Sequence, residues 1–276
     1  MRRLALCLLF WMSSAQASLW TQLVQQFELP RAPNDVRLVV EQVRWLKGDE
    51  NQTLAQARPW LAYIFTEIVK RDMPAELALL PFVESAFDPK AVSHADARGL
   101  WQFIGTTGQR YGLRKQGGCD GRYDVIQATD AALDHLADLH QETGDWFLAL
   151  AAYNAGLNRV KTAQQANLAA GKPTDYWHLE SLPEETRTYV PRLMALREVL
   201  TEQLILQEPV PVLPDQTLLF RQPVGPQTWF QLSSRINVPT NLLKKLNPCW
   251  SDGPTQAAQI LLPVNAQAVD WLTAWL

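Results

Sequence analysis

A segment that is apolar on nearly all its sides limits what this chain can fold into. After Asp145 the sequence reads Trp146-Phe147-Leu148-Ala149-Leu150-Ala151-Ala152-Tyr153-Asn154. A helix with this composition has no polar face to turn toward water, so it is stable only in a protein interior. The sequence therefore predicts a buried helix here, in a chain that must supply other elements to cover it.

Further helical patterns in the first 206 residues can supply that cover. Asp124 is a plausible N-cap for a helix that Gly144 ends, and Pro59 stands where a helix can start. Pro81 and Pro191 lack the backbone donor, so a break is expected near each. Helices are expected over residues 36–46, 60–71, 75–80, 125–141, 145–154, 158–170 and 181–206, with irregular glycine-rich chain over 99–121.

Three prolines within six positions separate this helical part from a shorter one. The sequence Pro209-Val210-Pro211-Val212-Leu213-Pro214 is typical of a stiff extended linker, so we expect a domain boundary over residues 207–216. A strand, two short helices and a closing strand are expected over residues 217–220, 228–235, 239–246 and 259–263. This order predicts a small α+β module. A tail helix over 266–276 is expected to cover the module with an apolar stripe, and membrane contact is the alternative.

The first 17 residues have the pattern of a secretory signal peptide. Two arginines precede an apolar stretch from Leu4 to Met12, and Ala15-Gln16-Ala17 is typical of a cleavage site. Nine apolar residues are too few to cross a bilayer, and Leu6 before Cys7 argues against a lipid anchor. Export would bring Cys119 and Cys249 into an oxidising compartment, where such a pair can bridge; the sequence leaves open whether it does.

Charge and composition exclude several classes of function. The formal net charge is −3, and no cluster of lysines and arginines provides the footprint that nucleic acid or an anionic membrane surface requires. No apolar run approaches the length of a bilayer span. The four histidines form no recognisable metal-ligand set, and His135 and His140 are expected on a solvated surface.

One glutamate stands in an apolar setting. Glu84 lies within Leu79-Leu80-Pro81-Phe82-Val83-Glu84-Ser85-Ala86-Phe87. Apolar surroundings disfavour the ionised carboxylate and raise its pKa, so the side chain could donate a proton near neutral pH, as the acid of a glycosidase does. Taken alone, the pattern fits a solvent-facing glutamate at a helix end better than it fits an acid. No second carboxylate is convincing, and Asp88 before Pro89 is interpreted as structural.

Three further motifs follow Glu84-Ser85 along the chain. They are Gly99-Leu100-Trp101-Gln102, Ala151-Ala152-Tyr153-Asn154-Ala155-Gly156 and Glu185-Thr186-Arg187-Thr188-Tyr189-Val190. In this order the four motifs resemble those of the family 1 lytic murein transglycosylases, over about residues 59–206. Residues 73–81 and 174–177 are similar to the membrane-bound D subtype. The resemblance implies a mainly α fold, with a goose-type-lysozyme-like transglycosylase (SLT) domain.

This resemblance also implies roles for individual residues. Glu84 matches the catalytic acid, and the hydroxyl of Tyr189 is expected to reach that glutamate or the substrate. Trp101 is expected to form a wall against a sugar ring, with core packing as the alternative. The residues expected to bind substrate are Ser85, Gly99, Leu100, Trp101, Gln102, Tyr153, Asn154 and Tyr189. No metal or organic cofactor is expected.

The single-acid pattern suits a route without hydrolysis, which is the route that the resemblance implies. Glu84 would protonate the glycosidic oxygen between N-acetylmuramic acid and N-acetylglucosamine, and would then deprotonate the muramoyl C6 hydroxyl, which attacks C1 and gives a 1,6-anhydro sugar. A muramidase that uses water and an inactive glycan-binding scaffold are the alternatives. The expected partner is peptidoglycan glycan strands in the periplasm, bound by a monomer; peripheral association with membrane or cell wall stays open.

These inferences define a domain plan. The C-terminal module loosely resembles a LysM-type peptidoglycan-binding domain, and a packing appendage is the alternative. The expected segments are a signal peptide (1–17), an N-terminal helical segment packed on the core (18–58), the catalytic domain (59–206), a proline-rich linker (207–216) and the LysM-like α+β module (217–276).

Overall fold

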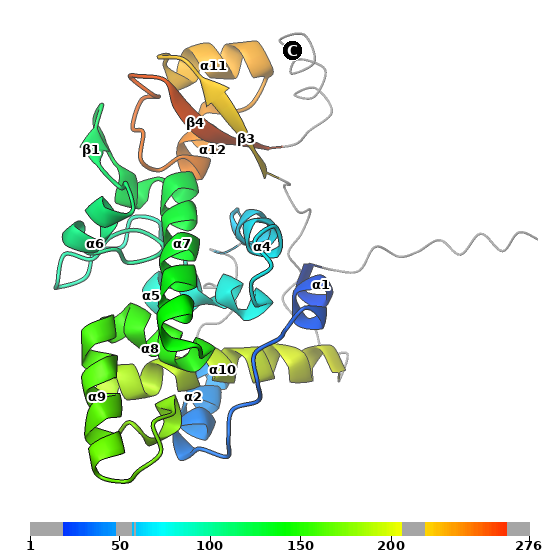
Figure 1. The fold of residues 1–276 in the computed structure, drawn as a ribbon. Helices are drawn as coiled ribbons and strands as arrows, with labels where there is room; N and C mark the ends of the chain where they lie inside the picture. Colours follow the sequence, from blue (N-terminus) through cyan, green and yellow to red (C-terminus); the bar gives the residue numbers. More distant parts are fainter. Residues whose placement is uncertain (1–18, 48–56, 58, 206–218, 264–276) are drawn as a thin grey trace, which may run out of the picture.

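The computed structural model describes residues 19–47, 57, 59–205 and 219–263. The predicted signal peptide, the proline-rich linker and the tail helix lie outside these residues. A helical body and a small module of two strands and two helices make up the described structure (Figure 1). No helix in the described ranges is long and apolar enough to span a bilayer.

The segment that is apolar on nearly all sides is helix α8 (Trp146–Ala155), and it lies in the interior as predicted. Asp145 caps it by accepting a hydrogen bond from the Leu148 amide at 2.9 Å. Its residues from Phe147 to Ala152 are buried. Helices α7 (Val125–Thr143), α9 (Leu157–Ala169) and α10 (Glu184–Ile205) pack against it.

The ends of α7 agree with the sequence prediction. The Asp124 carboxylate accepts a hydrogen bond from the Gln127 amide at 3.0 Å, and Gly144 ends the helix in the left-handed conformation. Both ends are therefore set by residues next to the helix, because an N-cap carboxylate and a left-handed glycine satisfy backbone groups locally.

Helix α10 runs through Pro191 without a break, so the predicted interruption is wrong. Proline has no backbone N–H and leaves the carbonyl four residues earlier, that of Arg187, without its helical donor. The Tyr176 hydroxyl donates to this carbonyl at 2.8 Å, and Arg37 Nη1 donates to it at 3.2 Å. These two donors replace the missing bond, so the helix continues. Tyr176 belongs to the short helix η3 (Tyr176–His178).

The N-terminal helices lie against α10. Helix α1 (Leu19–Gln25) buries Leu19, Trp20 and Leu23, and α2 (Val36–Lys47) packs along α10. The fully buried carboxylate of Glu76 ties these parts together, since it accepts hydrogen bonds from the amides of Glu28 (3.1 Å) and Leu29 (3.0 Å) and pairs with Arg197 at 3.1 Å.

Short elements connect the large helices and form one wall of the site. Helix α4 (Leu61–Val69) precedes η1 (Ala75–Leu79) and α5 (Leu80–Ser85), so the chain breaks before Pro81 and the proline stands in the first turn of α5. The glycine-rich region is irregular as predicted. Its elements are α6 (Gly105–Arg110), the antiparallel strands β1 (Lys115–Gln116) and β2 (Cys119–Asp120), and η2 (Gly121–Tyr123).

The C-terminal module has the predicted order of strand, helix, helix and strand. Strand β3 (Leu219–Val224) pairs antiparallel with β4 (Ala258–Pro263), with Leu219 opposite Pro263. Helices α11 (Trp229–Ile236) and α12 (Thr240–Leu246) lie between them in sequence and pack on each other. Buried residues of the module form a core of their own around Trp229, Leu232, Ile236 and Ile260.

The module is fixed to one end of the helical body, near the start of α7 (Figure 1). Cys119 of β2 and Cys249 form a disulfide across 130 positions of sequence, which answers the question that the sequence left open. Arg221 of β3 pairs with Asp130 at 2.6 Å and with Glu67 at 3.0 Å. These contacts join the two parts through a covalent bond and a shared group of charges.

Candidate active site

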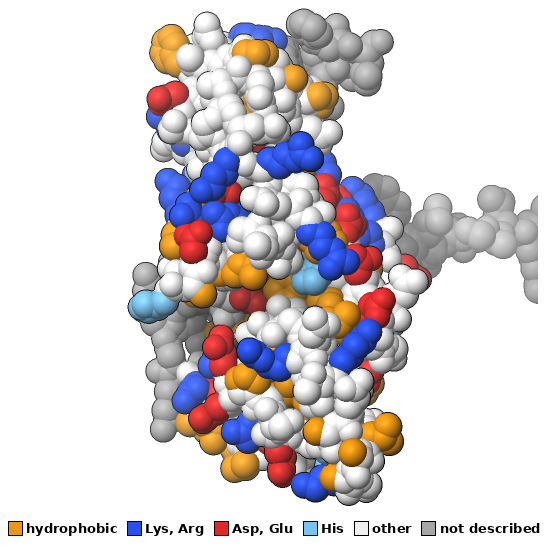
Figure 2. Space-filling view, turned by 60° about the vertical axis from the view of Figure 1, so that its left-hand side comes forward, with side chains coloured by type: hydrophobic (Ala, Val, Ile, Leu, Met, Phe, Trp, Pro, Cys, Tyr) orange, Lys and Arg blue, Asp and Glu red, His pale blue; other side chains and the backbone are white. Residues whose placement is uncertain are grey.

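A groove with a volume of about 1320 Å³ crosses the helical body. Its walls come from α5, α6, α7, α8, α9 and the start of α10, together with the irregular chain before α6. Figure 2 shows it as a hollow with hydrophobic side chains inside and charged side chains around it. Glu84, Gln102, Tyr153, Asn154 and Tyr189, all predicted to act at the site, line it.

Glu84 reaches the groove from the end of the short helix α5. The chain leaves this helix through Ala86 and Phe87, both in the left-handed region at φ 51° and 59°. Left-handed backbone is costly for residues other than glycine and persists only where the surroundings enforce it. Phe87 is fully buried and its ring contacts that of Phe82, with centroids 4.5 Å apart. Core packing therefore fixes the place from which Glu84 enters the groove.

The surroundings of Glu84 prepare it as an acid. Burial raises the pKa of its carboxyl to about 7, and the negative charge of Glu185 adds to this rise, whereas the Tyr189 hydroxyl and the positive charge of Arg192 oppose it. Tyr189, buried on α10, donates a hydrogen bond to Glu84 Oε1. The hydroxyl thus stands where the resemblance predicted it, and the carboxyl is half protonated near neutral pH.

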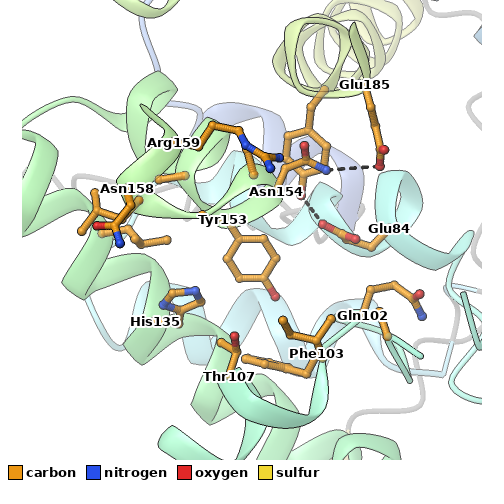
Figure 3. A pocket seen from close by; sticks show the side chains of 18 of the residues that line it. Glu84, Gln102, Phe103, Thr107, His135, Tyr153, Asn154, Asn158, Arg159 and Glu185 are labelled. Carbon is orange, nitrogen blue, oxygen red and sulfur yellow. Dashed lines mark hydrogen bonds between the residues drawn. The ribbon is translucent and has the colours of Figure 1, made fainter. Parts of the chain in front are cut away.

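The end of α8 contributes Tyr153 and Asn154 (Figure 3). The Tyr153 hydroxyl donates to the backbone carbonyl of Trp101 at 2.8 Å, which ties α8 to the glycine-rich chain. The Asn154 amide accepts a hydrogen bond from Thr186 Oγ1 at 2.7 Å and donates one to Glu185 Oε1 at 3.5 Å. The amide is thereby held in one orientation at the groove surface.

Glu185 is a site residue that the sequence reasoning missed. Its carboxylate lines the groove, contacts Asn154 and lies close enough to Glu84 to affect its pKa. It belongs to the quoted motif Glu185-Thr186-Arg187-Thr188-Tyr189-Val190, in which only Tyr189 was given a role. The signal was therefore present, but a solvated glutamate in the first turn of a helix has an ordinary structural explanation.

Trp101 does not form a wall against a substrate, so that prediction is wrong for its side chain. The indole is fully buried, and its Nε1 donates to Thr129 Oγ1 at 3.1 Å. The alternative of core packing is correct. The contribution of Trp101 to the groove wall is indirect, through the backbone carbonyl that holds Tyr153.

Leu100 and Gly99 are buried behind the groove, and Ser85 is partly exposed next to Glu84. Ser85 Oγ donates to the Leu100 carbonyl at 3.0 Å, and the Leu100 side chain is buried. Gly99 has φ +77°, and a Cβ there would lie 2.0 Å from the Arg122 carbonyl oxygen. The glycine is required by packing against η2 and not by the approach of a ligand. The predicted contacts of Gly99 and Leu100 are therefore corrected to supporting ones, whereas Ser85 is partly exposed and its contact with a substrate stays a prediction.

Gln102 lines the groove with its side chain held in place. Its Nε2 donates to the Gly99 carbonyl at 2.8 Å, and its backbone is left-handed with φ 48°. The Gln102 amide nitrogen thus donates to a carbonyl of its own loop, while the side chain stays partly exposed at the groove.

His135 was expected on a solvated surface and instead lines the groove, half-buried beside Tyr153. The ring centroids of the two residues are 5.3 Å apart. His140 is stacked on Trp146 with centroids 4.1 Å apart. The sequence could not place His135 at the groove, because the groove forms only when α7 packs beside α8. The spacing of five residues between His135 and His140 indicated only that they do not share a helical face.

One grouping of potential metal ligands occurs in the described ranges, made of Cys119, Asp124 and Cys249. The two sulfurs are bonded to each other in the disulfide and so cannot act as thiolate ligands. This grouping does not form a metal centre.

Comparison with known proteins identifies the domain that carries most of this site. Residues 63–175 match the model of the transglycosylase SLT domain, a range that contains Glu84, Gln102, Tyr153 and Asn154. The match places a transglycosylase SLT domain within residues 63–175 of the chain.

Among individual relatives, the chain is similar to membrane-bound lytic murein transglycosylase D of Escherichia coli strain K12. The two are 42% identical over 185 residues, which cover 66% of this chain and 40% of the relative. A putative tributyltin chloride resistance protein of Alteromonas sp. strain M-1 is 42% identical over 127 residues, covering 46% of this chain and 58% of that protein. Membrane-bound lytic murein transglycosylase F 2 of Alkalilimnicola ehrlichii is 33% identical over 130 residues, covering 44% and 26%. The chain thus spans about two fifths of the length of its type D relative.

Proposed function

We propose that this chain is an exported peptidoglycan lytic transglycosylase. It cleaves the β-1,4 bond between N-acetylmuramic acid and N-acetylglucosamine without water and leaves 1,6-anhydro ends. The observation that carries the proposal is Glu84, a carboxyl with a pKa raised to about 7, hydrogen-bonded to Tyr189 in a groove of about 1320 Å³. The SLT domain match and the lytic murein transglycosylase relatives support the same class.

In the proposed reaction Glu84 acts twice. Protonated, it gives its proton to the glycosidic oxygen as the bond from that oxygen to the muramoyl C1 breaks. The acetamido oxygen of the same sugar bonds to C1 and carries the developing positive charge, as in substrate-assisted glycosidases. Glu84, now ionised, takes the proton of the C6 hydroxyl as O6 attacks C1 and the acetamido oxygen leaves. The acid is restored, and no water is consumed.

The residues around Glu84 serve these two roles. A pKa of about 7 keeps both protonation states accessible, so one side chain can act as acid and then as base. Tyr189 fixes the carboxyl through Oε1, and Asn154 offers an oriented amide for hydroxyl or N-acetyl groups. No metal or organic cofactor takes part in this proposal.

The remaining domain assignments are also proposals. Residues 59–206 form the catalytic domain, with the helical segment 18–58 packed on it, and residues 1–17 direct export to the periplasm. The module from 217 to 276 is LysM-like and adds contacts to glycan strands. Its strand, helix, helix, strand order supports this assignment, and so does its attachment beside the groove-bearing domain. We propose that the protein acts as a monomer.

One observation favours a second candidate function. Glu185 places another carboxylate in the groove, and a hydrolase of the inverting kind needs a second carboxylate to activate water. A muramidase is therefore the alternative function, and the experiment must distinguish it from a lytic transglycosylase.

Mass spectrometry of the muropeptides released from purified peptidoglycan tests the proposal. Products lighter by one water than the corresponding reducing muropeptides are expected from the mature protein. Reducing ends would establish the muramidase instead. The Glu84→Gln variant should release no products above background, and full lytic activity of that variant would overturn the assigned acid.

A further inference from the structure

Three polar side chains form a chain of hydrogen bonds in the groove on the far side of Tyr153 from Glu84. His135 Nδ1 lies 2.9 Å from the Tyr111 hydroxyl oxygen, and that hydroxyl donates to Asp138 Oδ2 at 2.7 Å. All three side chains line the groove. Figure 3 shows Tyr153 between His135 and Glu84.

The positions of the protons in this chain follow from the partners. A tyrosine hydroxyl carries one hydrogen, and a carboxylate can only accept, so the Tyr111 hydrogen points to Asp138. His135 Nδ1 must then donate to the Tyr111 oxygen. A neutral imidazole has a single N–H, so Nε2 carries a lone pair and is an acceptor.

The electrostatics keep this arrangement in place. Burial, together with the positive charge of Arg110, lowers the pKa of His135 to about 4. Burial and the hydrogen bond to Asp138 raise the pKa of Tyr111 to about 12. Between these values the imidazole is neutral and the phenol protonated, so the acceptor at Nε2 persists over the whole neutral range.

The surroundings of Nε2 fit a sugar. Nε2 makes no hydrogen bond to any residue that the structure describes. The His135 ring packs against Tyr153, Tyr111 and Phe103, with centroids 5.3, 4.8 and 6.4 Å away. An aromatic surface with one fixed acceptor matches the apolar face of a pyranose that carries an N–H or O–H donor.

We propose that His135 Nε2 forms a subsite that accepts a hydrogen bond from the acetamido N–H of an N-acetylhexosamine unit. The unit lies beside the sugar whose bond Glu84 protonates. Tyr111 and Asp138 are positioning residues, which select the tautomer of the imidazole. The identity of the ligand rests on the proposed function, whereas the tautomer does not.

The test uses the full mature chain as the Glu84→Gln variant, which keeps the groove and prevents turnover. The ¹⁵N chemical shifts of His135 without ligand should show hydrogen on Nδ1 and a bare Nε2. Addition of peptide-free glycan strands should shift the Nε2 signal, and calorimetry should show binding weakened about tenfold by His135→Phe, the loss of one hydrogen bond.

Two further variants complete the design. His140→Phe is the matched control, because His140 is on the same helix and stacks on Trp146 outside the groove; it should bind like the parent. Tyr111→Phe should let hydrogen appear on Nε2 and weaken binding even if His135→Phe folds poorly. Hydrogen on Nε2 in the parent, or equal weakening by His140→Phe, overturns the subsite. Failure of the parent to bind glycan contradicts the proposed function and also the ligand assigned here.

Discussion

At the scale of single residues, the chemistry of this site comes from carboxyl groups in unequal surroundings. Glu84 is buried enough for its pKa to rise to about 7, while Glu185 is exposed at the first turn of α10. Tyr189 is hydrogen-bonded to Glu84, and Asn154 is hydrogen-bonded to Glu185. The raised pKa of Glu84 keeps its protonated form accessible near neutral pH, which the proposed acid requires.

Glu84→Gln should remove activity and also stabilise the protein in alkaline solution. The loss of a general acid lowers the rate by about 10²- to 10⁴-fold. The folded-state pKa of Glu84 lies above the unfolded value of 4.5, so folding loses stability as pH rises from 4.5 through 7. Chemical unfolding should show the variant more stable than the parent by about 1–3 kcal/mol at pH 8 and equally stable at pH 4. An equal difference at both pH values would contradict the raised pKa.

Glu185→Gln should move the alkaline limb of the pH–rate profile to lower pH. The charge of Glu185 raises the pKa of Glu84, so its removal lets Glu84 ionise earlier. Because Glu185 is exposed, the shift should be about 0.2–0.7 pH units. Glu184→Gln, one residue away and outside the groove, is the control and should leave the limb in place. A shift of the same size in both variants would mean that general charge, and not the position of Glu185, is responsible.

At the scale of elements, α10 depends on side chains that replace a helix hydrogen bond. Tyr176→Phe removes one donor to the Arg187 carbonyl and should lower the free energy of unfolding by about 1–2 kcal/mol. In the Pro191→Ala background, Tyr176→Phe should lower the free energy of unfolding by much less, because the introduced alanine supplies a backbone N–H to the Arg187 carbonyl. A double-mutant cycle by urea unfolding measures this coupling. Strictly additive effects would mean that Tyr176 acts elsewhere.

At the scale of the whole molecule, the disulfide and the ion pairs of Arg221 hold the module against the helical body. Replacing both Cys119 and Cys249 by serine should reduce the free energy of unfolding by about 2–4 kcal/mol, since the bridge closes a long loop. A reducing agent should lower the unfolding midpoint of the parent and leave that of the double variant unchanged. An equal midpoint for the reduced and oxidised parent would show that the bridge does not stabilise the fold.

Much of the fold was predictable because its signals are local. Asp124 and Gly144 bound α7, Asp145 starts α8, and the apolar composition of α8 dictates its burial. N-caps, left-handed glycines and apolar periodicity act over a few residues, so the sequence alone contains them. The apolar setting of Glu84 is local too, and together with the order of the four motifs it indicated a candidate acid.

Other features depend on partners that are distant in the chain, and only the tertiary structure decided them. Trp101 is buried against Thr129, the disulfide spans 130 positions, and His135 reaches the groove only through the packing of α7 on α8. Pro191 stays within a helix because Tyr176, from another segment, satisfies the freed carbonyl. In each case the local sequence is compatible with either a buried or an exposed position, or with more than one partner. A contact with a residue distant in the chain decides which of these occurs. The sequence by itself therefore determined most of the helices and the ends of α7 and α8, and its motifs indicated Glu84 as the candidate acid. The tertiary structure determined which side chains face the groove.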